Sequence, residues 1–85
     1  MIKGIIADSI KRVAKRFVEK IELDRVCPGL FEQVCRDNHW EFKLFDYGHS
    51  GWEVDWWAEI ITDSNTIIIE GCMYYGTAKL TLSNG

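Results

Sequence analysis

The hydrophobic pattern of this chain changes its period at His39, and this change restricts the folds open to it. Before His39, apolar residues return at steps of three and four, which places them on one side of an α-helix. After His39, apolar and polar residues alternate, which is typical of strands with one buried face. The chain therefore predicts an α+β fold, in which an N-terminal helical layer covers a C-terminal antiparallel sheet.

Two helices are expected before the change of period. The first ends near Leu23, because Pro28 and Gly29 prevent its continuation. Pro28 suits the first position of a second, shorter helix, which ends at Asp37–Asn38. The expected buried stripes are Ile2, Ile6, Ile10, Val13, Phe17 and Ile21 in the first helix, and Leu30, Phe31, Val34 and Cys35 in the second.

Four alternating segments follow, separated by the turn-forming stretches DYGHSG, TDSN and YYG. The last of these is the weakest turn, so residues 66–82 could instead form one strand bent at Gly76. With 85 residues, the chain has the size of one domain, spanning residues 1–85. The predicted fold class is thus α+β, with two N-terminal helices packed on one face of a four-stranded antiparallel β-meander.

Side-chain complementarity predicts the strand register, because a slip of one residue would turn the core face to solvent. In the first hairpin we expect Lys43 opposite Asp55, a favourable pair of opposite charges. Across the TDSN turn we expect Trp56 opposite Gly71, the largest side chain over the smallest. The further expected pairs are Leu44–Val54, Phe42–Trp56, Trp40–Ala58, Ile60–Ile67, Ala58–Ile69 and Trp57–Glu70.

The same pattern predicts the core of the domain. Trp52 and Trp56 point inward, and replacing Trp56 or Phe17 with alanine is expected to cost about 3–5 kcal/mol. The expected core residues are Ile6, Ile10, Val13, Phe17, Ile21, Phe31, Trp40, Phe42, Leu44, Val54, Trp56, Ile60, Ile67, Ile69 and Leu80.

The outer sheet face is the leading candidate for function. Trp57 points outward, between Glu41 and Glu70 on the neighbouring strands, and aromatic side chains beside carboxylates favour a cationic partner. This predicts a small non-enzymatic protein-interaction module: an adaptor, an inhibitor or a dimerising domain. Two alternatives are a solvated, neutral face and a face covered by the chain termini. The predicted partner-binding residues are Trp57, Glu41, Glu53, Asp55, Glu59, Glu70, Phe45 and Tyr74.

A basic set on the first helix suggests nucleic-acid binding as the alternative function. Acidic residues interleave with this set, and the net charge of the chain is −3, so a solvated helix face is favoured. The basic residues are Lys11, Arg12, Lys15, Arg16 and Lys20, and the acidic ones are Asp8, Glu19 and Glu22.

The chain contains the cysteine and histidine residue types that bind metal ions. The three cysteines are an odd set without CxxC spacing, and a Cys27–Cys35 disulfide would leave Cys72 unpaired. The five residues Cys27, Cys35, His39, His49 and Cys72 have the types but not the spacing of a zinc site, so no metal is expected.

No enzyme is expected either. Cys35 and His39 lack a local nucleophile signature, and no phosphate loop or dinucleotide motif occurs, so no cofactor is predicted. The apolar runs are too short to span a membrane, and Asp8 interrupts the one at the N-terminus. We therefore expect a cytoplasmic protein whose partner is a protein or a second copy, without membrane association.

Overall fold

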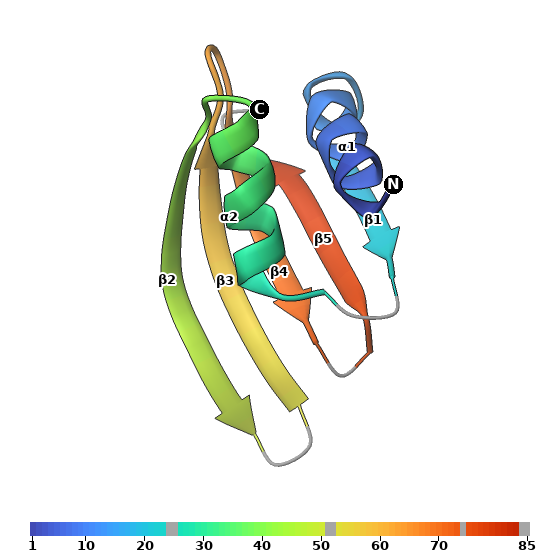
Figure 1. The fold of residues 1–85 in the computed structure, drawn as a ribbon, viewed down its shortest axis with the longest axis vertical. Helices are drawn as coiled ribbons and strands as arrows, with labels where there is room; N and C mark the ends of the chain where they lie inside the picture. Colours follow the sequence, from blue (N-terminus) through green and yellow to red (C-terminus); the bar gives the residue numbers. More distant parts are fainter. Residues whose placement is uncertain (24–25, 51–52, 74, 84–85) are drawn as a thin grey trace.

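Two helices lie on one face of a five-stranded antiparallel sheet (Figure 1). The computed structural model describes residues 1–23, 26–50, 53–73 and 75–83, with the backbone alone for residues 46–50 and 53–54. The strand order β1-β5-β4-β3-β2 leaves β1 and β2 at the two edges. The elements are α1 (Ile2–Arg16), β1 (Val18–Glu22), α2 (Pro28–Asp37), β2 (Glu41–Ser50), β3 (Glu53–Ile61), β4 (Thr66–Cys72) and β5 (Thr77–Leu82).

The predicted α+β class is confirmed, but the first helix is shorter than expected and the sheet gains a strand. At Phe17 the backbone φ is 68°, which stops α1 and reverses the chain. The Phe17 N–H donates to the Val13 carbonyl at 2.9 Å, and its own carbonyl accepts from the Leu82 N–H at 2.8 Å. The turn at Phe17 therefore starts β1, whose register pairs Ile21 with Ala78 of β5.

The apolar pattern predicts a first helix that is too long, because a spacing of four residues between apolar side chains is compatible with a helix and with a strand. Ile21 is buried, as expected, but from β1 and not from a helix. Phe17 was predicted in the core and is 56% exposed, since it occupies the turn between the two elements. Ile2, at the first residue of α1, is also exposed.

The second helix agrees with its prediction. It begins at Pro28 and ends at Asp37, and the Asn38 side-chain amide caps it by donating to the Val34 carbonyl at 2.9 Å. His39 then adopts φ 60°, the left-handed conformation common just after a helix. This turn directs the chain from α2 into the edge strand β2.

Residues 66–82 form two strands, so the alternative of one bent strand is wrong. β4 and β5 pair antiparallel from Ile67–Leu82 to Cys72–Thr77. Gly76, with φ 63°, lies in the turn between them, and its N–H donates to the Met73 carbonyl at 3.3 Å.

The core centres on Trp56, which packs on Gly71 as predicted. A Cβ atom at position 71 would overlap the Trp56 indole, so this position requires glycine. The Trp56 Nε1–H donates to the Val26 carbonyl at 3.2 Å, and the indole lies 5.3 Å from the Phe31 ring, centroid to centroid. Trp56 therefore joins the sheet to α2 and to the segment before it.

The predicted core is otherwise confirmed, with three corrections. Leu44 is 46% exposed, because it lies on the edge strand β2 and has a neighbouring strand on one side only. Trp40 and Phe42 are half-buried against the core rather than within it. The side chains of Trp52 and Val54 lie outside the described residues. The core also contains Val26, which the prediction missed. Ala58 and Ala78 are buried as well; the strand alternation placed them on the inner face, although the predicted core did not include them.

The predicted register is correct for the second hairpin and wrong for the first. β3 and β4 pair Trp56 with Gly71 and Trp57 with Glu70, as expected. In the first hairpin, however, Lys43 lies opposite Glu59 and not Asp55, a displacement of four residues. Lys43 meets a carboxylate in both registers, so the charge criterion could not separate them. The stretch DYGHSG was taken as a turn, whereas β2 continues through it to Ser50.

Of the helices in the described part of the chain, none combines the length and apolar character that crossing a membrane requires.

Candidate protein-interaction face

The face of the sheet turned away from α1 and α2 is not covered by any other described element (Figure 1). Strand alternation fixes its composition, because every second residue of each strand points to this side. We call it the open face. Its described residues are Val18, Lys20 and Glu22 of β1; Thr77, Lys79 and Thr81 of β5; Thr66, Ile68, Glu70 and Cys72 of β4; Asp55, Trp57, Glu59 and Ile61 of β3; and Glu41, Lys43 and Phe45 of β2.

An exposed aromatic pair stands on the open face. Trp57 is 44% exposed and Phe45 is 52% exposed, and their ring centroids lie 5.0 Å apart at an interplanar angle of 34°. A bulge in β2 produces this contact: Leu44 pairs with Ala58 and Asp46 with Trp57, which leaves Phe45 without a partner in the ladder. Sequence reasoning placed both rings on this face but missed their contact, because it used the wrong β2–β3 register.

Three carboxylate residues surround the Trp57 position. Asp55 and Glu59 precede and follow it by two residues on β3, which is about 7 Å along a strand on the same face. Glu70 lies directly opposite on β4, as predicted. The open-face position of Trp57 is thus flanked by acids on its own strand and on β4.

The fourth carboxylate expected beside Trp57, that of Glu41, is placed elsewhere. Glu41 pairs with Ile61, at the far end of β3, and its carboxylate lies 3.3 Å from the Lys43 ammonium. This correction follows from the four-residue displacement of the first hairpin. Of the other predicted site residues, the side chains of Glu53 and Tyr74 lie outside the described residues.

Two lysines on the open face were missed as part of this surface. Lys20 and Lys79 lie directly opposite each other on β1 and β5, and Lys79 also lies opposite Glu70. Sequence reasoning assigned Lys20 to a helix, so it could not place the two side by side. The sequence did indicate the outward position of Lys79, because Lys79 alternates with the apolar residues Ala78 and Leu80, which are buried.

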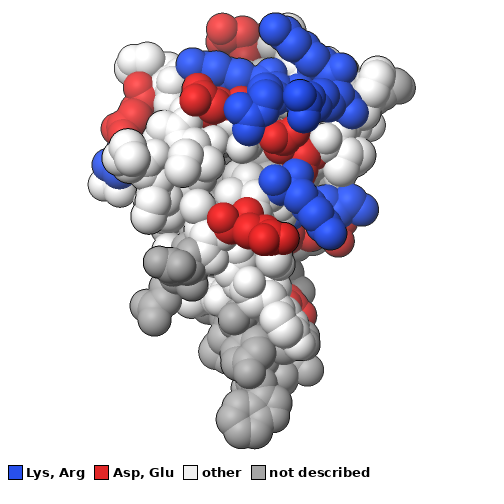
Figure 2. All heavy atoms as spheres, turned by 90° about the vertical axis from the view of Figure 1, so that its right-hand side faces the viewer, with Lys and Arg blue, Asp and Glu red and all other residues white. Residues whose placement is uncertain are grey.

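The basic residues predicted for nucleic-acid binding do not share one helix face. Figure 2, which views the side of α1 and β1, shows Lys and Arg side chains gathered there with acidic side chains among them. Lys20 belongs to β1, and Glu19 of the same strand turns toward α1 instead. The Glu19 carboxylate accepts from Arg12 Nη2 at 2.8 Å and Nε at 3.0 Å, and lies 3.8 Å from Arg16 Nη1.

This ion pair serves the fold, since it joins α1 to β1. Arg12 also donates to the hydroxyl of Ser9 at 3.1 Å, which satisfies a buried polar group on the inner side of the helix. Of the predicted basic set, Lys11 and Lys15 remain exposed on α1 without an ion pair to another described residue. Nucleic-acid binding through this set stays a prediction.

The buried Cys35 is not an activated nucleophile. All three cysteines are free thiols, so the Cys27–Cys35 disulfide is not formed. Burial, with the nearby Glu32 carboxylate as a second cause, raises the pKa of the Cys35 thiol to about 12. The thiol is therefore protonated at neutral pH, whereas a nucleophilic cysteine requires a lowered pKa. Within the described ranges, no group of three or more His, Cys, Asp or Glu residues could hold a metal ion.

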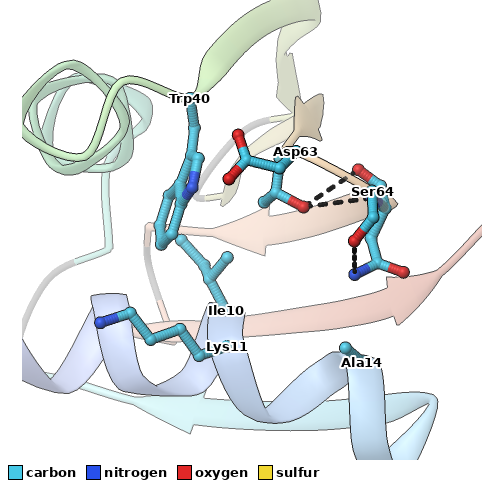
Figure 3. A pocket seen from close by; sticks show the side chains of 8 residues that line it. Ile10, Lys11, Ala14, Trp40, Asp63 and Ser64 are labelled. Atoms are coloured by element: carbon cyan, nitrogen blue, oxygen red, sulfur yellow. Dashed lines mark hydrogen bonds between the residues drawn. The ribbon is translucent and has the colours of Figure 1, made fainter.

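A shallow hollow of about 210 Å³ lies between α1 and the β3–β4 turn (Figure 3). The Trp40 indole forms one wall, and Ile10 of α1 lies across from the turn residues. The turn bonds to itself, because Thr62 and Asn65 exchange hydrogen bonds of 2.9 Å and 3.2 Å. The volume of the hollow is below the roughly 300–1,000 Å³ that is typical of small-molecule sites. The open face is consequently the stronger candidate site.

Neither a family model, nor a curated protein, nor a solved structure matches this chain.

Proposed function

We propose that this protein is a non-enzymatic interaction module that binds a protein partner through the open face. The observation that carries the proposal is the Trp57–Phe45 pair, two large aromatic side chains left half-exposed on a sheet face that no described helix covers. The few residues that dominate the binding energy of protein interfaces are enriched in Trp, Tyr and Arg, and Trp buries a large area at low entropic cost.

The contact between the two rings supports this role. An aromatic pair at this separation is stabilised by about 0.5–1.5 kcal/mol beyond its area burial, so the rings are held in place before a partner arrives. The acids around Trp57 add specificity, because they favour a cationic group placed over the indole. Binding through this face requires no reacting group.

The test compares two alanine variants that remove exposed apolar side chains from different faces. Trp57→Ala changes the open face, and Ile5→Ala is the matched control, since Ile5 is 47% exposed on α1. Affinity capture from native lysate is expected to lose its specific proteins with Trp57→Ala and keep them with Ile5→Ala. The melting temperatures of both variants should stay near that of the wild type. A Trp57→Ala protein that is folded and captures the same proteins contradicts the proposal.

A further inference from the structure

Charge is divided between the two halves of the open face. On the β1–β5 side, Lys20 and Lys79 outnumber one carboxylate, Glu22. On the β3–β2 side, three carboxylates outnumber the one cation, Lys43, which is paired with one of them. These carboxylates belong to Asp55, Glu59 and Glu41. β4 is the middle strand and separates the two halves.

The lysine half carries more cations than anions, although Glu70 of β4 lies directly opposite Lys79. Lys20 and Lys79 face each other across neighbouring strands, an arrangement of like charges that destabilises a sheet. Neither ammonium forms an ion pair with another described residue. An anionic group supplied by a partner would therefore bind here and relieve the repulsion.

The acidic half carries more anions than cations, with Lys43 as its one described cation. Asp55 and Glu59 stand on either side of the half-exposed Trp57 and, like Lys20 and Lys79, form no ion pair within the described part of the chain. A lysine placed over the indole would meet both the aromatic ring and the two carboxylates. Each half of the face thus carries an excess of the charge that is in the minority on the other half.

One symmetric arrangement brings the two halves together. When two copies meet face to face about a two-fold axis parallel to β4, β5 of one copy lies over β3 of the other. Aligned packing of two sheets, at about 30°, permits this arrangement. A two-fold axis lying in the interface and perpendicular to the strands would instead place β5 over β5, and so the basic half of one copy over the basic half of the other. The axis along β4 does bring one pair of like charges together, because Glu70 of β4 is level with Lys79 and Trp57 and would face Glu70 of the other copy. It nevertheless sets the basic half of each copy over the acidic half of the other, so the charge distribution favours this axis.

We propose that the partner of the open face is a second copy of this chain, in a two-fold dimer in which Lys79 of each copy binds over Trp57 of the other, between Asp55 and Glu59. The inference rests on the proposed function, because it uses the same face. Five strands about 4.8 Å apart give a face roughly 20 Å wide. A face of this width fits a dimer at the small end of specific interfaces, one that dissociates on dilution.

The test exchanges the charges of each half and measures molecular mass by analytical ultracentrifugation over a range of concentrations. One variant is Lys20→Glu/Lys79→Glu, and the other is Asp55→Lys/Glu59→Lys. Each alone places like charges against like, so its dissociation constant for self-association should rise by about tenfold or more. An equimolar mixture should form the heterodimer, because the exchanged positions of one variant then meet opposite charges on the other.

The matched control is Lys11→Glu/Lys15→Glu, which makes the same change of charge on α1, away from the open face. It should dimerise like the wild type, and thermal melts should show that all variants are folded. A mixture of the two charge-swapped variants that fails to associate overturns the proposal, as does a dimer that neither swap weakens.

Failure of the dimer is distinguishable from failure of the proposed function. A wild-type protein that stays monomeric at the highest concentration overturns the two-fold dimer. If its capture of other proteins still depends on Trp57, the open face remains an interaction site for a different partner. If capture does not depend on Trp57 either, both proposals are wrong.

Discussion

Trp56 and Trp57 are neighbours in the chain, yet they belong to opposite faces of the sheet and to different roles. Trp56 is 2% exposed and contacts Gly71, Phe31 and the Val26 carbonyl. Trp57 is 44% exposed, and its ring packs against that of Phe45. The apolar area of the first indole is already removed from water by folding. Much of the area of the second remains available to a partner.

The two faces also differ in how their charges are satisfied. On the inner side, the Glu19 carboxylate is paired with Arg12, which also satisfies Ser9. On the open face, Lys20 lies against Lys79, and neither forms an ion pair with another described residue, although Glu70 lies opposite Lys79. The Glu19 carboxylate on the inner side is therefore paired within the chain, whereas the two lysines of the open face are not paired with any described residue.

The largest expected effect on stability is that of Trp56→Ala, which is compared with Trp57→Ala. Trp56→Ala should lower the free energy of unfolding by about 3–5 kcal/mol, because it leaves a cavity beneath α2 and an unpaired Val26 carbonyl. Trp57→Ala should lower it by about 1 kcal/mol or less, since the ring is half-exposed. Urea denaturation followed by circular dichroism measures both. Equal losses in the free energy of unfolding would show that Trp57 stabilises the fold as much as Trp56 does.

An intermediate effect is expected at Gly71. Gly71→Ala should cost about 1–3 kcal/mol, because the new methyl group overlaps the Trp56 indole and forces it from its position. The matched control is Gly4→Ala, where a Cβ atom meets nothing within 4 Å. Inside α1, this control should raise stability by about 0.5–1 kcal/mol. A Gly71→Ala protein as stable as the wild type would contradict the close packing of Trp56 on the sheet.

The smallest effect is expected at Phe17. Phe17→Ala should change the free energy of unfolding by only about 0.5 kcal/mol, because the side chain is exposed at the turn after α1. Val13, one turn earlier and fully buried, is the comparison: Val13→Ala should cost about 2 kcal/mol. The expectation of 3–5 kcal/mol from the sequence pattern assumed a longer helix. Thermal or urea unfolding of the two variants distinguishes a helix that ends at Arg16 from one that continues to Leu23. A large loss of stability in Phe17→Ala would favour the longer helix.

The sequence by itself determined the elements whose signals are local. The change of period at His39 predicts helices before and strands after, and Pro28 marks the start of α2. The short TDSN turn fixes the β3–β4 register, because few residues separate the paired strands and only one register places Trp56 over Gly71. The position of Trp57 on the outer face, opposite Glu70, follows from the same turn.

The tertiary structure decided what depends on partners distant in the chain. Residues 18–22 form β1 because β5 offers a free edge some 60 residues later. A spacing of four apolar residues is compatible with helix and strand alike, so sequence alone did not distinguish them. The bulge that brings Phe45 to Trp57 and the pairing that sets Lys20 beside Lys79 are likewise products of strand pairing. The charge division of the open face exists only once β1 and β2 occupy its opposite edges.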